Sequence, residues 1–173
     1  MTSSHTQLKP LAPDGAVAPI RAAVTAVAEQ SFFAMVDGCD ERTLEKSPPN
    51  AWLVAMIRFD DGHTSGSLAC WVPPDLALTM FDSFCGREPG QPLPPAHQIY
   101  DLVGEFSNMV CGDWLSRSIG HRQSFELSQP IVVQAPRPAN NMARRLWVKV
   151  NERPLAVDWY VNQSFSMLHE FEA

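Results

Sequence analysis

The clearest helical pattern in the chain lies at residues 97–119, HQIYDLVGEFSNMVCGDWLSRSI. Its apolar residues recur every three or four positions, which predicts a helix from about His97 to Ile119 that ends at Gly120. One face of this helix collects the apolar side chains Ile99, Leu102, Val103, Phe106 and Val110. A long helix with one apolar face needs a second layer to pack against, so the rest of the chain should supply one.

The opposite face of the same helix carries polar groups. Asp101, Glu105 and Asn108 fall together with Gly112 in a wedge of roughly 60°. An acid and an amide should therefore point outward from a helix that is anchored by its back. We take this face as the candidate functional site.

Two further helices are predicted before the motif helix. The first runs from about Ala16 to Val36 and stops at Gly38. A short helix opens after Pro73 and is closed by Gly86, with an apolar stripe of Leu76, Met80, Phe81 and Phe84.

Strand patterns fill most of the remaining chain, at residues 52–59, 65–72, 124–134, 145–151 and 155–161. Residues 60–63 (DDGH) predict a hairpin turn between the first two strands, and residues 152–154 (ERP) predict one between the last two. Apolar and polar residues alternate in the last two strands, which favours an antiparallel sheet with one covered face.

The chain can be divided into two similar halves, residues 16–86 and 97–162, joined by a proline-rich connection. Residues 1–15 are expected to be a disordered lead-in and residues 163–173 a C-terminal tail. When Asp101 is laid over Thr25, Glu105 falls on Glu29 and Asn108 on Phe32, so only the second half keeps the polar set. We predict one α+β domain of duplicated helix-plus-strands units around a central, mainly antiparallel sheet, with the long helices on one face.

The amino-acid composition argues against some classes of function. The 173 residues are 45% hydrophobic and 18% charged, as in a globular protein, and the net charge is -6. Nucleic-acid binding is disfavoured because the 13 basic residues are scattered. No apolar run is long enough to cross a bilayer and no signal pattern opens the sequence, so we expect a cytoplasmic protein without membrane contact.

The cysteines and histidines do not form a recognisable metal or nucleophile motif. No C-x-x-C pair occurs, and no cysteine has a histidine at metal-ligand spacing. Buried free thiols are therefore expected, and no cofactor or metal is assigned to this chain. Cys111 and His121 remain a nucleophile–base pair that the sequence leaves open.

Three stretches carry a family resemblance. Residues 104–112 (GEFSNMVCG) followed by residues 125–133 (FELSQPIVV) resemble the E-x-x-N helix and the proline-initiated strand of the CheX/CheC/FliY family of chemotaxis phosphatases. Residues 69–78 (ACWVPPDLAL) are similar to the strand-to-helix junction of that family. The likeness covers about residues 16–162, and Phe32 in place of a second amide puts the chain nearer the CheX type.

The resemblance implies a phosphatase that hydrolyses the aspartyl phosphate of a phosphorylated, CheY-like response regulator. It assigns Asn108 to the attacking water and Glu105 to the lysine beside the regulator's phosphorylated aspartate. Mg²⁺ would be held by the regulator, and a homodimer is expected because CheX-type members form one. The chemistry agrees, since an acyl phosphate needs a water held in line more than it needs a strong base.

Each residue also has a structural explanation. Asn108 and Glu105 could be solvated surface groups. Asp101 could contribute to docking of a partner, or it could stabilise the N-terminal end of its helix through its negative charge. Gly104 and Gly112 suggest close approach of a partner, but packing within the chain explains both glycines equally well.

Two other functional classes stay open. One is a non-catalytic docking module for a receiver domain or a flagellar switch component. The other is an unrelated hydrolase or ligand-binding protein, which predicts a deep cavity instead of a convex helix face.

Overall fold

The computed structural model describes residues 15–39, 51–88, 90–119, 124–138 and 144–161. The predictions for the lead-in at 1–14 and the tail at 163–173 lie outside these residues. The described chain is an α+β fold of three helices and one antiparallel sheet, as the sequence predicts. The helices are α1 (Val17–Phe32), α3 (Pro74–Cys85) and α4 (Ala96–Ile119). The strands are β1 (Val36–Gly38), β2 (Trp52–Asp60), β3 (Ser65–Val72), β4 (Glu126–Leu127), β5 (Ile131–Ala135), β6 (Arg145–Val150) and β7 (Arg153–Val161).

The sheet has the symmetry that a duplicated chain should produce. Its strand order is β1-β6-β7-β3-β2, with β4 and β5 both paired along the outer side of β2. Each half contributes one hairpin, β2–β3 or β6–β7, and the edge strand beside each hairpin comes from the other half. Strands β3 and β7 meet antiparallel at the centre. The strands of the two halves therefore occupy equivalent places in the sheet, as the predicted duplication requires.

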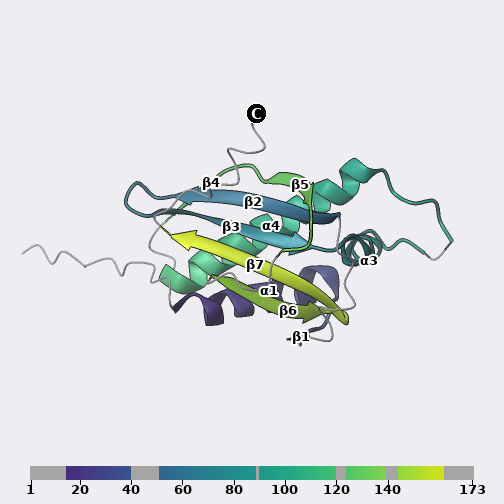
Figure 1. The fold of residues 1–173 in the computed structure, drawn as a ribbon, viewed down its shortest axis with the longest axis horizontal. Helices are drawn as coiled ribbons and strands as arrows, with labels where there is room; N and C mark the ends of the chain where they lie inside the picture. The colour runs from purple at the N-terminus through teal and green to yellow at the C-terminus, as the bar shows by residue number, and fades with distance from the viewer. Residues whose placement is uncertain (1–14, 40–50, 89, 120–123, 139–143, 162–173) are drawn as a thin grey trace, which may run out of the picture.

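Helices α1 and α4 pack side by side against one face of the sheet, and in Figure 1 they cross behind the strands. Their apolar faces form the main core together with the inward side chains of every long strand. Trp114 of α4 lies edge-on against Phe59 of β2, with ring centroids 5.5 Å apart. Phe106 of α4 meets Phe32 of α1 in the same way at 5.5 Å. These aromatic contacts fix α4 at two levels along its length.

The first helix is shorter than predicted. It ends at Phe32 because Phe33 adopts the left-handed conformation (φ 52°, ψ 35°), and the chain then enters the edge strand β1, which the sequence analysis missed. A three-residue strand carries too little periodicity to be separated from the end of a helix. In the short helix α3, Leu76, Met80 and Phe81 of the predicted apolar stripe are buried. Phe84, the fourth member, stacks on Phe32 but is 54% exposed.

The predicted strand over 124–134 is interrupted. Ser128 and its neighbours separate β4 from β5, and the register against β2 shifts by one residue between them. The Ser128 hydroxyl accepts a hydrogen bond from the backbone N–H of Arg58 at 3.0 Å, which replaces a bond of the ladder. Pro130, which has no N–H to donate, follows this bulge.

The second hairpin turn lies one position earlier than predicted. Asn151 and Glu152 have positive φ angles (46° and 64°), as a two-residue hairpin turn requires, and Arg153 and Pro154 already belong to β7. The Asn151 side chain also accepts a hydrogen bond from the backbone N–H of Met35 at 2.9 Å, so it connects this turn to the start of β1.

Both faces of the central strands are covered, whereas the alternation predicted one. β6 alternates as expected, but Ala156 and Asp158 on the second face of β7 are also buried. Asp158 accepts hydrogen bonds from Arg145 Nε at 2.6 Å and from Trp71 Nε1 at 2.9 Å, so its buried charge is paired. This second face forms a smaller apolar cluster: Trp52, Val54, Met56, Ala69, Trp71 and Ala156.

Gly66 tests the packing of the central strands. A Cβ at this position would lie 2.2 Å from the Tyr160 carbonyl oxygen and 2.3 Å from Phe59 Cζ. We therefore expect Gly66→Ala to lower the free energy of unfolding by about 3 kcal/mol, as overpacking of a rigid site does. Gly38→Ala is the matched control, because nothing lies within 4 Å of its Cβ position. Equal denaturant midpoints for the two variants would contradict this packing.

Candidate functional site

The candidate site is the outward face of α4. Asp101 and Glu105 are exposed and Asn108 is partly exposed, while Val103, Phe106 and Val110 on the back of the helix are fully buried. The predicted polar face therefore exists, and its amide can be reached from outside. Within the described ranges of the chain, the side chains of Asp101, Glu105 and Asn108 make no hydrogen bond or ion pair.

Gly104 has an intramolecular explanation. It is buried, and a Cβ there would lie 3.1 Å from Pro130 Cγ and 3.5 Å from Val132 Cγ2. The absent side chain lets β5 approach α4 closely, so the packing account applies to Gly104. Gly112 differs, because it is partly exposed and a Cβ there would meet nothing within 4 Å. Close approach of a partner therefore remains a prediction for Gly112 only.

The equivalent face of α1, in the first half, does not carry the same polar set. Glu29 is exposed like Glu105, but Phe32, which corresponds to Asn108, is only 1% exposed. Its ring packs between Phe84 at 5.4 Å and Phe106 at 5.5 Å. A core side chain therefore occupies this position in the first half, and it packs against the back of α4.

Ser107 is a buried polar residue of the motif helix that the sequence analysis did not single out. Its hydroxyl donates a hydrogen bond to the Val103 carbonyl at 2.8 Å, within the helix. It also interacts with the thiol of Cys70 on β3, so it joins α4 to the sheet. In the sequence, only the helical period indicated that Ser107, between Phe106 and Asn108, would face the core.

The buried thiols are poor nucleophiles. Burial raises the pKa of Cys70 to about 12, although a hydrogen bond with Ser107 opposes the shift. Burial also raises the pKa of Cys111, with Cys70 adding to the shift. His121, its proposed partner, lies outside the described residues. The geometry of Cys111 favours the structural account of this thiol.

The described residues offer neither a metal site nor a membrane-spanning helix. No group of three or more histidine, cysteine, aspartate or glutamate side chains is placed to hold a metal ion there. Among the described helices, none has the length and apolar character needed to cross a membrane.

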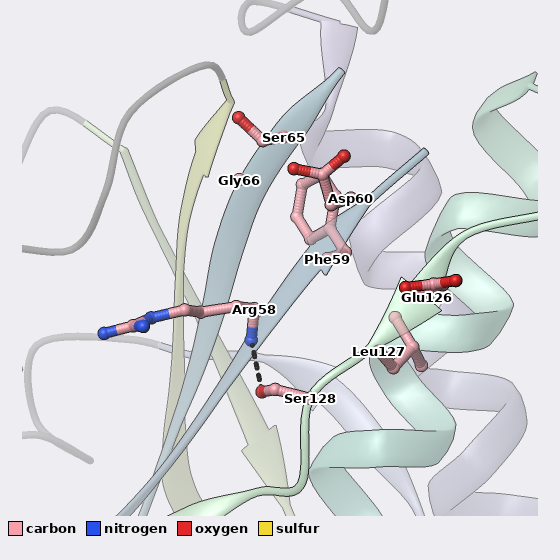
Figure 2. A pocket seen from close by; sticks show the side chains of 8 residues that line it. All are labelled: Arg58, Phe59, Asp60, Ser65, Gly66, Glu126, Leu127 and Ser128. Carbon is pink, nitrogen blue, oxygen red and sulfur yellow. Dashed lines mark hydrogen bonds between the residues drawn. The ribbon is translucent and has the colours of Figure 1, made fainter. Parts of the chain in front are cut away.

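A cavity of about 440 Å³ lies at the end of the β2–β3 hairpin, beside β4. Figure 2 shows that the side chains of Arg58, Asp60 and Glu126 in this cavity point in different directions. The hydrogen bond drawn there is the structural one between Arg58 and Ser128. No residue of the α4 face lines this cavity, and among the described residues no hydrogen bond joins its serines to its carboxylates. It therefore does not favour the unrelated-hydrolase alternative.

Thiol reactivity tests the burial of Cys70 and Cys111. In the folded protein at pH 8 we expect iodoacetamide to modify exposed Cys85, while Cys70 and Cys111 react only after unfolding. Peptide mass spectrometry would identify the modified residues. Alkylation of native Cys111 as fast as Cys85 would contradict this and restore a reactive thiol.

The same burial makes stability depend on pH. Because folding raises the pKa of Cys70 to about 12, its contribution is complete below the pKa of an unfolded thiol, about 8.5. As the pH rises from about 8.5 toward 12, the unfolded chain releases the thiol proton while the folded chain retains it. The free energy of unfolding therefore falls over this pH range.

The comparisons of this chain with known proteins all indicate one protein family. The family model for chemotaxis phosphatase CheX matches residues 53–144, which include β2, β3, α3, α4 and β5. Among curated proteins, no significant sequence match is found.

Solved structures with the same fold cover most of this chain. Chemotaxis protein CheX from Vibrio vulnificus is 19% identical with a TM-score of 0.60, and the match covers 85% of this chain and 99% of that one. CheX from Desulfovibrio desulfuricans is 16% identical with a TM-score of 0.62 and the same coverage, 85% and 99%. CheX in a CheX–CheY–BeF3–Mg²⁺ complex from Borrelia burgdorferi is 12% identical with a TM-score of 0.56, covering 85% and 97%. With the family model matching more than half of its length, the chain belongs to the CheX family of chemotaxis phosphatases.

Proposed function

We propose that this protein hydrolyses the aspartyl phosphate of a phosphorylated, CheY-like response regulator. Family membership supports a phosphatase, and the Borrelia structure shows that a CheX protein can form a complex with CheY. The observation that carries the proposal is an outward-facing amide, Asn108, on a helix whose back is fully buried. Such a helix can enter a partner's site without losing its own shape.

Asn108 is proposed to position the attacking water. A carboxamide can accept a hydrogen bond from water through its oxygen and donate one to a phosphoryl oxygen through its nitrogen. Because Asn108 makes no side-chain hydrogen bond within the described residues, both groups are free to do so. The amide then contributes by fixing the line of attack, since the acyl phosphate is already reactive.

Glu105 lies one helical turn before Asn108 and is exposed. We assign it to a cation on the regulator, the lysine beside the phosphorylated aspartate. Asp101, one further turn back, is assigned to docking on the same face. Gly112 has no side chain, and nothing in the described chain fills the space that a Cβ would occupy there. This space would let the regulator approach the helix closely.

The partner is proposed to supply the metal. Mg²⁺ bound by the regulator would neutralise phosphate charge, so this chain needs to provide only the amide and the docking groups. A homodimer is part of the same proposal, and it rests on the resemblance to CheX-type members.

The alternative function is a docking module that binds a receiver domain without accelerating hydrolysis. Such a module would need the carboxylates of the α4 face, but it would not need an amide in the position of Asn108. We therefore favour the phosphatase.

Asn108→Ala separates these two functions. With receiver domains phosphorylated by acetyl phosphate, we expect the rate of phosphate release at saturation to fall about 100-fold, as when a positioned donor is removed from a transition state. The concentration for half-maximal rate should change little, because the amide acts mainly on the water. Equal rates for variant and wild type would favour the docking module.

Glu105→Ala tests the docking contact. We expect the half-saturating concentration of phosphorylated receiver to rise about tenfold, which corresponds to the loss of one charge-assisted contact. Glu29→Ala is the matched control, because Glu29 is an exposed carboxylate at the equivalent place in α1. Steady-state kinetics of both variants would measure this, and an equal effect would show that only overall charge matters.

A further inference from the structure

Ser107 is a fully buried polar residue of α4, and it directly precedes Asn108 in the sequence. A buried hydroxyl must find hydrogen-bond partners, because an unpartnered polar group in a core is costly. Apolar burial alone therefore does not explain a serine at this position. Among the described residues of the helix, the other buried side chains are apolar: Leu102, Val103, Phe106, Val110, Cys111, Trp114 and Leu115.

The Ser107 hydroxyl takes part in two hydrogen bonds. It donates to the Val103 carbonyl at 2.8 Å, one turn back in the same helix. It also forms a hydrogen bond with the thiol of Cys70 on β3. A hydroxyl has one proton, and since this proton goes to Val103, the neutral thiol is the donor in the second bond. A chain of hydrogen bonds therefore runs from the Cys70 thiol through the Ser107 hydroxyl to the Val103 carbonyl.

Cys70 lies in the middle of the sheet, so this chain of hydrogen bonds ends on a rigid support. It is fully buried, and it lies opposite Ala55 of β2 and Val157 of β7 in the two ladders that flank β3. In Figure 1, α4 runs obliquely behind these central strands. A strand that is paired on both sides cannot shift alone, so it can hold the helix in one orientation.

Gly104, in the same part of α4, limits the helix from another side. A Cβ there would lie 3.1 Å from Pro130 Cγ, so the helix backbone already approaches the start of β5 closely. Such packing limits distance but has little directional preference, whereas a hydrogen bond weakens when its angle departs from linearity. The contact at Gly104 thus sets the spacing between α4 and β5, while the bond between Ser107 and Cys70 sets the rotation of α4 about its axis.

The rotation of α4 matters because Asn108 is presented at the surface of the helix. Atoms there lie about 5–6 Å from the helix axis, so a rotation of about 10° moves the amide by roughly 1 Å. A misplacement of about 1 Å can lower a reaction rate on the order of 100-fold. Because the Asn108 side chain makes no hydrogen bond within the described residues, its place depends on the helix that carries it.

We propose that Ser107 is a positioning residue for the phosphatase reaction, and that its bond with Cys70 fixes the rotation of α4 and thereby the place of the Asn108 amide. This inference rests on the proposed function and adds the residues that hold the amide in line. Ser107 and Cys70 themselves stay in the core and do not touch the receiver domain.

Ser107→Ala and Cys70→Ala each remove the bond between α4 and β3. With a phosphorylated CheY-type receiver domain, we expect each variant to lower kcat about tenfold and to keep KM within about twofold of wild type, because the docking groups of α4 remain. The double variant should lower kcat no further than either single variant, since both changes remove one interaction. Cys70→Ser should keep kcat within about twofold of wild type, because a hydroxyl can replace the thiol as donor.

Ser67→Ala is the matched control. Ser67 is also a buried serine, 1% exposed on β3, but it lies on the opposite face of the strand from Cys70. Its hydroxyl has no hydrogen-bond partner within the described chain. Its replacement should therefore leave kcat and KM unchanged. A fall in kcat equal to that of Ser107→Ala would overturn the inference, because the loss of any buried hydroxyl would then have the same effect.

NMR spectra of the protein alone give a readout that does not depend on activity. The side-chain amide signals of Asn108 should shift in Cys70→Ala and stay at their wild-type positions in Cys70→Ser and Ser67→Ala. If the wild type releases no phosphate, the proposed function fails, and these spectra alone decide whether Cys70 helps to hold Asn108.

Two kinetic results would overturn the inference. Wild-type kcat in both Ser107→Ala and Cys70→Ala would do so, while Asn108→Ala would still report on the proposed function. An equal fall in kcat for Cys70→Ser and Cys70→Ala would also do so, because it would assign the effect to packing and not to the hydrogen bond.

Discussion

The structure depends on the packing of the back of α4 against the sheet. Phe106 and Trp114 are fully buried there, and each contacts a ring from another element, Phe32 in α1 and Phe59 in β2. On the flank toward β5, Gly104 allows Pro130 to approach the helix closely. Burial of large aromatic side chains is the main favourable term in such a core, and directed contacts between rings hold the helix in one orientation. Because the helix cannot turn, its opposite face is fixed toward solvent.

Duplication explains why one half carries the candidate site and the other supports it. The two halves exchange their edge strands, so neither hairpin has a complete sheet of its own. In the first half the position of the amide is occupied by Phe32, which fills the space between α3 and α4. The same ring also stacks on the exposed Phe84 of α3. The first half therefore supplies core packing at the position where the second half presents an amide.

The family assignment and the geometry answer different questions. The match to the CheX model covers residues 53–144, from β2 through β5, and identifies the chain as a member of that family. The fold is shared with CheX structures at 16–19% identity, so the sheet and helices tolerate extensive sequence change. The reason is physical, since a core accepts many combinations of apolar residues of suitable volume. A solvent-exposed amide has no such packing reason to be present, and for that reason Asn108 carries the functional proposal.

The local periods of helix and strand were enough to predict the fold class, the bounds of β3, nearly those of α4, and the face on which Asp101, Glu105 and Asn108 lie. Tertiary structure alone decided features that depend on contacts between distant residues. It buried Gly104 under Pro130, ended α1 at a left-handed Phe33, and placed Phe84 at the surface although its helical stripe is apolar. It also covered the second face of the central strands, where Asp158 is held by Arg145 and Trp71. No local period records which residue of another strand or helix will lie opposite, so these outcomes required the folded chain.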